Sequence, residues 1–297
     1  MDIGRYLQEK KEIVDLSLEK HFPKAEFPAH LRQAMRHSLF AGGKRIRPIL
    51  SLAACEAVGG KEEKILPYAC ALEMIHTYSL IHDDLPAMDN DDYRRGKPTC
   101  HKAFGEAAAI LAGDALLTEA FRLMTNRPPT PGDSFDGWLI LDVVNRVAQA
   151  SGIFGMVGGQ AVDIESEGRD VDLATLQYIH THKTGALILA SVQMGARLGG
   201  ARDQDYRALT QYGERAGLAF QIADDVLDVE GKVASLGKNP GSDLSKKKAT
   251  YPALLGVEES KKRARELIDL AIDSLSPFGR EADPLRGIAR FIVAREF

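Results

Sequence analysis

The sequence has little cysteine and no long apolar run. Its three cysteines, Cys55, Cys70 and Cys100, are an odd number and form no C-x-x-C pair. This argues against a disulfide framework and a zinc site, and for a reducing compartment. No run of about 18 apolar residues occurs, so no membrane-spanning helix is predicted. The charged N-terminus has no apolar signal core. We therefore expect a cytoplasmic protein with no membrane partner.

A strong excess of either charge is also missing. The formal net charge is −4 over 297 residues, so bulk electrostatics predict neither nucleic acid nor an acidic membrane as partner. The hydrophobic content of 44% is ordinary for a globular protein. No stretch has the composition of a linker, and no fixed-period repeat occurs. We expect one domain over residues 1–297.

Strand-like alternation is almost absent, and helical periodicity dominates. The predicted helices cover residues 5–20, 28–40, 48–58, 67–84, 103–126, 136–153, 172–182, 184–199, 203–230, 250–275 and 284–295. Pro67 is expected to open the fourth of these helices, and Pro86 to end it just after Asp84. The prediction is an all-α fold, a single large helical bundle around a central cavity.

An acidic stretch follows this fourth helix. Five aspartates fall within residues 83–92, and Arg94 and Arg95 come directly after them. A solvated acidic loop is the simpler interpretation. However, Mg²⁺ prefers carboxylates together with substrate phosphates, and guanidinium groups suit phosphate. A helix C-terminus also favours cations. The stretch therefore indicates a metal and diphosphate site.

A second acidic cluster lies in the predicted helix 203–230. Asp224 and Asp228 are separated by about 40° around a helix and about 6 Å along it, so they share a face. Asp225 lies about 100° away, where it can turn toward a different partner. Apolar residues surround these acids, which indicates an interior helix with carboxylates facing a cavity. Two such clusters across a bundle would hold Mg²⁺ around one diphosphate and favour ionisation of a C–O bond.

Pro86 explains how the first cluster can work as a unit. On an unbroken helix Asp83 and Asp89 would lie about 240° apart and could not share a metal. A break at Pro86 lets Asp89 turn back toward Asp83.

Five motifs of the chain resemble those of the trans-isoprenyl diphosphate synthases. They are Gly42-Gly43-Lys44-Arg45-Ile46-Arg47-Pro48, Asp83-Asp84-Leu85-Pro86-Ala87-Met88-Asp89, Arg94-Arg95-Gly96-Lys97-Pro98-Thr99, Lys183-Thr184-Gly185 and Phe220-Gln221-Ile222-Ala223-Asp224-Asp225-Val226-Leu227-Asp228. The resemblance runs from about residue 30 to about residue 256, and is greatest to the bacterial farnesyl diphosphate synthases. It implies an all-α fold, a large single-domain bundle of antiparallel helices around a central cavity, that forms a homodimer. The implied reaction condenses isopentenyl diphosphate with dimethylallyl or geranyl diphosphate.

The resemblance also implies roles for individual residues. Mg²⁺, three ions per active site, would be bound by Asp83, Asp84, Asp89, Asp224 and Asp228. Positions matching contacts to isopentenyl diphosphate are Lys44, Arg47, His76 and Arg95. Positions matching contacts to the allylic diphosphate are Arg94, Lys183, Thr184, Gln221, Lys238 and Lys248. The catalytic set would be Asp83, Asp84, Asp89, Lys183 and Asp224. In this mechanism the allylic diphosphate ionises, isopentenyl diphosphate attacks the carbocation, and a proton is lost.

Spacing bears on the histidines and on product length. His76 and Asp83 are seven residues apart and share a helix face, which favours a functional His76, whereas His180 and His182 are expected to be structural. The family places its product-length residues at Tyr78 and Ser79. Helical geometry points Ser79 toward the cavity and Tyr78 about 140° away from Asp83. An aromatic residue at Tyr78 resembles the C15 producers, so farnesyl diphosphate is the expected product.

Three alternatives remain open at this stage. A geranylgeranyl diphosphate synthase of the same fold would share every motif. A terpene cyclase would not need the isopentenyl diphosphate residues or the second aspartate cluster. A non-catalytic partner subunit or metal-binding protein is the alternative outside enzymes, although both acidic motifs are intact. An EF-hand is excluded because the stretch 89–94 lacks the required glycine and glutamate spacing.

Overall fold

The computed structural model describes residues 1–22, 27–125, 136–230 and 249–294. Its helices are α1 (Ile3–His21), α2 (Ala29–Leu39), α3 (Ile46–Ala57), α4 (Glu62–Asp83), α5 (Cys100–Phe104), α6 (Glu106–Thr125), α7 (Gly137–Ser151), α8 (Met156–Ser166), α9 (Leu173–Ile179), α10 (Ala186–Leu198), α11 (Asp203–Glu230), α14 (Tyr251–Leu255), α15 (Val257–Ser274) and α16 (Asp283–Ala294). A π-helix, η1 (His180–Gly185), joins α9 to α10, and a 3₁₀ turn, η2 (Arg280–Ala282), precedes α16. The predicted all-α fold is confirmed.

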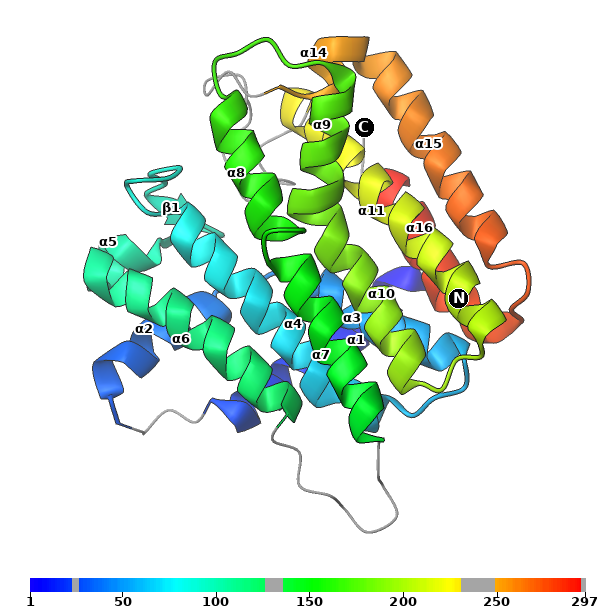
Figure 1. The fold of residues 1–297 in the computed structure, drawn as a ribbon, viewed down its shortest axis with the longest axis horizontal. Helices are drawn as coiled ribbons and strands as arrows, with labels where there is room; N and C mark the ends of the chain where they lie inside the picture. Colours follow the sequence, from blue (N-terminus) through cyan, green and yellow to red (C-terminus); the bar gives the residue numbers. More distant parts are fainter. Residues whose placement is uncertain (23–26, 126–135, 231–248, 295–297) are drawn as a thin grey trace.

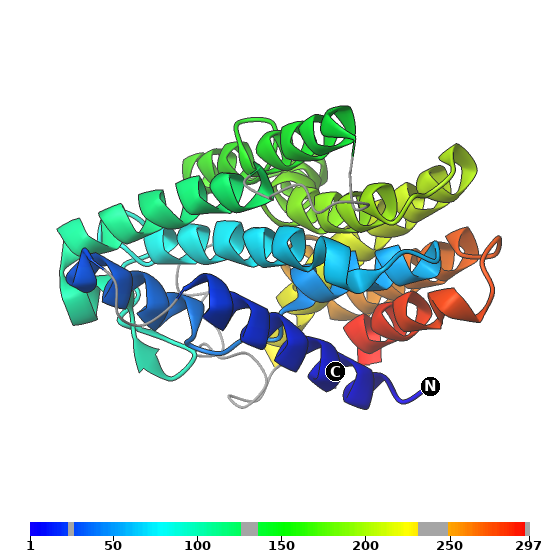
Figure 2. The ribbon, with the colours of Figure 1, turned by 90° about the horizontal axis from the view of Figure 1, so that it is seen from below.

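Helix α4 is the centre of the bundle. It contacts α1, α2, α3, α6 and α10, and Figure 2 shows it between the α1 layer and the α6–α7 layer. Twelve of its residues are buried, so it is apolar around most of its circumference, as a central helix must be. This position carries His76, Tyr78 and Asp83 into the interior.

Two large apolar cores fill the bundle. One gathers around α4 and α6, with Leu72, Ile75 and Leu116 fully buried. The other joins α3, α10, α11, α15 and α16, whose arrangement is seen in Figure 1. At the α3–α10 crossing, a Cβ on Gly195 would lie only 2.0 Å from the carbonyl oxygen of Ser51. Glycine is therefore required there for the two backbones to approach.

Several helix boundaries differ from the predictions. Helix α4 begins at Glu62, not at Pro67, which lies inside it. Glu62 and Glu63 occupy the first turn, where carboxylates are favourable, and this extends the helix before the proline. The break expected at Lys183 does not occur, because η1 continues α9 into α10. Helix α8 was not predicted, since its glycines resemble a loop.

The described residues include one small sheet, which the sequence pattern did not predict. Strands β1 (Tyr93–Arg94) and β2 (Lys97–Pro98) form an antiparallel hairpin. Its turn is made by Arg95 and Gly96, with φ of 53° and 75°, as a two-residue hairpin turn requires. Strands of two residues are too short to show a period. None of the described helices is long and apolar enough to cross a membrane.

Candidate active site

The first acidic motif turns back on itself at the end of α4. The helix ends at Asp83, and Asp84 is its C-cap. The backbone N–H of Asp89 donates a hydrogen bond of 2.8 Å to the carbonyl oxygen of Asp83. Burial raises the pKa of the Asp83 carboxyl, and the charge of Asp89 raises it further, while Lys183 opposes them. The expected return of Asp89 to Asp83 is therefore confirmed.

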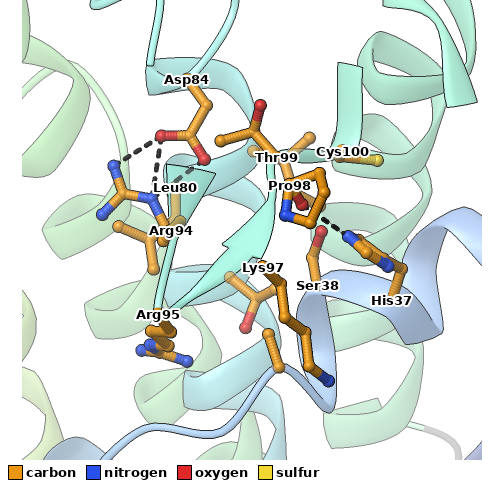
Figure 3. Close-up of a pocket in the computed structure, with 13 residues that line it drawn as sticks. His37, Ser38, Leu80, Asp84, Arg94, Arg95, Lys97, Pro98, Thr99 and Cys100 are labelled. Atoms are coloured by element: carbon orange, nitrogen blue, oxygen red, sulfur yellow. Dashed lines mark hydrogen bonds and ion pairs between the residues drawn. The ribbon is translucent and has the colours of Figure 1, made fainter. Parts of the chain in front are cut away.

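Asp84 points to a different partner from Asp83. Its carboxylate is 3% exposed and accepts hydrogen bonds from Arg94 Nε and Nη2, the shortest at 2.5 Å. Figure 3 shows this fork, with Arg94 reaching from β1 to the end of α4. Such a bidentate pair fixes both side chains. Asp84 thus holds Arg94 in place, and its predicted metal contact stays a prediction.

The β1–β2 turn sends the two arginines to different partners. Arg95 lies below the hairpin in Figure 3 and donates to the carbonyl oxygen of Gly42 in the loop before α3. A Cβ on Gly43 would lie only 2.5 Å from the Arg95 guanidinium, which is too close. Glycine at this loop position therefore makes room for Arg95. The geometry separates Arg94 and Arg95, as expected.

The loop before α3 divides its cations between the interior core and the site. Lys44 is exposed. Arg45 is buried and bonds to Glu73 and Asp15, each at 2.8 Å. Arg47 is influenced by the charges of Glu73 and Asp224, and burial lowers its pKa. Its buried Nε has no hydrogen-bond partner among the described residues. A buried guanidinium with an unused donor is suited to bind an anion.

His76 sits among these arginines. Although part of its surface is accessible, it lies deep in the bundle, and this burial is the largest cause of a pKa well below the ordinary histidine value. Arg47, Arg95, Arg94 and Arg45 lower it further. His76 is therefore neutral near pH 7 and can donate one hydrogen bond to a substrate without adding a positive charge.

The π-helix brings the next predicted residues to the same region. Lys183 Nζ lies 2.6 Å from Asp163 Oδ2 on α8, and its charge acts on Asp83. Thr184 donates to Gln221 Oε1 at 2.8 Å. A Cβ on Gly159 would lie 2.2 Å from the backbone nitrogen of Lys183, so this glycine permits the α8–η1 contact. π-Helical segments often occur at functional sites.

The second acidic motif is carried by α11. Asp224 is near enough to influence Arg47, and Asp228 is buried on the same helix. Asp225 turns away, as expected, and bonds to His180. Lys183 acts electrostatically on Asp83, and Asp224 acts on Arg47, so each acidic motif has a cation near it. Lys238 and Lys248 lie outside the described residues.

Sequence reasoning missed Gln160 and Asp163. Asp163 pairs with Lys183, and Gln160, almost one turn earlier on α8, has a buried Oε1 without a hydrogen-bond partner in the described part of the chain. The only signal was the glycine pair 158–159, which indicated a close backbone contact but no helix. Without a predicted α8, these side chains could not be assigned to a face.

The donor set is suited to Mg²⁺. The candidates are all carboxylates, the hard ligands this ion takes, and the raised pKa of Asp83 shows that its charge is poorly compensated. No group of three or more possible ligands surrounds a single point within the described residues.

Tyr78 and Ser79 lie one turn before Asp83. Tyr78 is 7% exposed and belongs to the α4–α6 core. Burial and the Asp83 charge raise the pKa of its hydroxyl to about 12. Its ring meets His82 edge-on at 5.8 Å. Ser79 donates to the carbonyl oxygen of His76 at 2.9 Å, so its hydroxyl is satisfied within α4.

Known proteins match nearly the whole chain. A family model described as polyprenyl synthetase matches residues 28–276. The geranylgeranyl diphosphate synthase of Cyanophora paradoxa is 53% identical, covering 98% of this chain and 95% of that protein. The farnesyl diphosphate synthase of Geobacillus stearothermophilus is 48% identical, covering 100% and 99%. A solved FPP/GFPP synthase from Zymomonas mobilis superposes with a TM-score of 0.86 at 40% identity, covering 99% of each chain.

Proposed function

Because the chain belongs to the polyprenyl synthetase family and is a prenyltransferase, we propose that it condenses isopentenyl diphosphate with dimethylallyl and geranyl diphosphates to form farnesyl diphosphate. One observation carries the proposal. The end of α4 brings Asp83 and Asp89 together, with Lys183 acting on Asp83. Chemistry that transfers a prenyl group needs such opposed charges around a departing diphosphate.

The product length is the finer part of the proposal. The relatives carry both the farnesyl and the geranylgeranyl names at similar identity, so their names do not separate the two. The support for a C15 product is Tyr78, a bulky ring one turn before Asp83 and buried in the core. With Ser79 beside it, Tyr78 would close the apolar space available to a growing chain. Geranylgeranyl diphosphate is the second candidate.

The isopentenyl diphosphate site is proposed at the loop before α3. Arg47 offers a buried, unused Nε–H, Arg95 is held beside Gly43, and Lys44 is exposed at the rim. His76 is the neutral member and orients rather than neutralises the diphosphate. Together they would hold this substrate through charge-assisted hydrogen bonds.

The allylic diphosphate is proposed to bind on the other side. Arg94 is fixed by Asp84, and Lys183, Thr184 and Gln221 come from η1 and α11. Lys183 is paired with Asp163, which holds its ammonium in the site. The predicted contacts of Lys238 and Lys248 fall outside the described residues.

Mg²⁺ is proposed as the cofactor, three ions per site, held by Asp83, Asp84, Asp89, Asp224 and Asp228. When bound, the metal would neutralise the charge that develops on the leaving diphosphate. The protein's own groups do the remainder. Lys183 and Arg94 hold the allylic diphosphate, Arg47 and Arg95 hold isopentenyl diphosphate, and the apolar core excludes water from the carbocation. The proton is lost to the departing diphosphate.

We also propose a single-domain, cytoplasmic homodimer. The support for a dimer is a set of exposed apolar side chains on α6, α7, α8 and the turn between α7 and α8. These three helices form the uppermost layer in Figure 2. The side chains are Ile110, Leu111, Trp138, Leu141, Phe154 and Val157. Exposed apolar side chains gathered on neighbouring helices suit a protein partner. Sedimentation of wild-type protein and of Phe154→Ser tests this, and an unchanged monomer in both would contradict it.

The activity has a direct test. The protein is incubated with Mg²⁺, isopentenyl diphosphate and dimethylallyl diphosphate, and the dephosphorylated products are separated by chromatography. Farnesol is expected as the main product. Asp83→Ala and Asp224→Ala should lose the activity while their circular dichroism stays helical. If wild-type protein consumes no isopentenyl diphosphate, the proposal is wrong.

A further inference from the structure

Asp225 is the one acid of the second motif that the proposed reaction leaves unused. Its carboxylate is 4% exposed. Oδ2 accepts from His180 Nε2 at 2.8 Å and from the backbone N–H of Tyr251 at 3.0 Å. Oδ1 accepts from Gln221 Nε2 at 3.1 Å. Both oxygens are thus occupied by donors from three elements, η1, α14 and α11, so Asp225 anchors these elements to one another.

The anchor reaches the allylic side of the site through Gln221. A carboxylate only accepts hydrogen bonds, so the Gln221 amide must turn its nitrogen to Asp225 and its oxygen to Thr184. Thr184 in turn donates its proton to that oxygen at 2.8 Å. The order Asp225, Gln221, Thr184 therefore fixes which way each group faces.

A second connection from Asp225 holds the start of the π-helix. His180 is its first residue and is buried, and its ring lies 5.3 Å from that of Tyr251. A second contact with α11 lies at the other end of the π-helix, where a Cβ on Gly217 would lie 3.2 Å from the Gly185 Cα. The π-helix is thus tied to α11 at its first residue and near its end, with Lys183 between these ties.

We infer that Asp225 and His180 form a positioning pair, which sets the π-helix so that Lys183 meets the allylic diphosphate. This inference rests on the proposed function. A π-helix is rare and frequently marks a functional site, so the contacts that hold its two ends bear directly on the position of Lys183. Neither residue is among the substrate contacts proposed above, and the proposed isopentenyl diphosphate site lies on other elements, namely α3 with its preceding loop, α4 and the hairpin.

Two binding measurements test the pair without turnover. Calorimetry in Mg²⁺ follows an unreactive allylic analogue, in which sulfur replaces the bridging oxygen, and separately isopentenyl diphosphate alone. His180→Ala and Asp225→Asn should weaken the allylic analogue by about tenfold or more, as lost supporting contacts do. Isopentenyl diphosphate affinity should stay within about twofold of wild type, because its residues are not attached to this network. His180→Gln, which restores a donor, should recover most of the allylic affinity.

The Mg²⁺ concentration dependence of analogue binding separates positioning from ligation. Its midpoint should stay unchanged in Asp225→Asn and rise in Asp224→Asn, the matched neighbour on α11. A midpoint shift in Asp225→Asn equal to that in Asp224→Asn would overturn the inference. So would equal losses for both diphosphates, or no loss for either. If His180→Ala does not fold, Asp225→Asn with the His180→Gln comparison decides by the same outcomes. Wild-type protein that binds neither diphosphate would instead overturn the proposed function.

Discussion

The backbone N–H of Asp89 donates a 2.8 Å hydrogen bond to the carbonyl oxygen of Asp83, six residues earlier. This contact closes the loop that Pro86 opens, and it uses a carbonyl group that the end of α4 leaves without a helical partner. The two side chains are then close enough for each charge to matter to the other. A cation between them would relieve that repulsion.

Asp89→Asn should therefore weaken Mg²⁺ binding while changing the stability of the fold little. The half-saturating Mg²⁺ concentration is expected to rise about 10- to 100-fold, because one anionic ligand is lost while the backbone bond to Asp83 remains. The matched control is Asp92→Asn, in the same acidic run. Asp92 is exposed and pairs with Lys102 at 2.7 Å, so its midpoint should not move. Equal shifts in both variants would contradict the assignment.

The return of Asp89 could be predicted because proline acts locally. Pro86 ends a helix for steric reasons that need no tertiary information. The helical angle then shows that Asp83 and Asp89 could not share a metal on an unbroken helix. Pro67 shows the limit of the same argument. It lies within α4, because the packing of the central helix outweighs one missing N–H. A local rule gave the right result where the chain leaves the core and the wrong one inside it.

Arg45 and Lys44 give a prediction on stability. Arg45 has 1% of its side chain exposed and Glu73 2%, so Arg45→Ala would leave a buried carboxylate unpaired. Such a loss costs about 3–5 kcal/mol, or roughly 10 °C in melting temperature. Lys44→Ala, one residue earlier and exposed, should leave the melting temperature unchanged but raise the KM for isopentenyl diphosphate. Thermal melts followed by circular dichroism measure both, and similar melting temperatures would be the contrary result.

The difference between these neighbours was only partly accessible from the sequence. Lys44, Arg45 and Arg47 all fall in one basic loop, and its residue types do not state which cation turns inward. Arg45 adopts φ of 53°, which turns its side chain toward Asp15 and Glu73, far away in the sequence. The Asp225–His180 contact spans 45 residues and has the same character. Periodicity assigns faces within one helix, whereas such pairs depend on how helices cross.

His76 gives a prediction on pH. Its pKa in the folded protein lies well below 6.5, because burial and then Arg47, Arg95, Arg94 and Arg45 disfavour the charged ring. The unfolded chain takes up a proton below about pH 6.5 while the folded chain does not. This histidine therefore costs no stability above that pH, and stability is lost as the pH falls below it.

The measurement compares wild type with His76→Gln. Melting temperatures are recorded at about pH 7.5 and about pH 5.5, the two sides of the ordinary histidine pKa. The wild type should lose more on acidification than the variant, since only the wild type has this ring to protonate on unfolding. In the wild type, the His76 Cε1–H resonance should keep its chemical shift through pH 6.5. A resonance that titrates near 6.5 would show that the arginines do not act as described.

Tyr78→Ala should lengthen the product. Tyr78 is a buried ring on α4, one turn before Asp83, so its removal opens apolar volume toward the interior where a prenyl chain grows from the diphosphate. Chromatography of dephosphorylated products is expected to show C20 and longer alcohols beside farnesol. Tyr78→Phe is the matched control, because it keeps the ring and removes only a hydroxyl, and its product should remain C15. If Tyr78→Ala still makes only C15, this ring does not limit the chain, and Ser79 becomes the residue to enlarge or reduce.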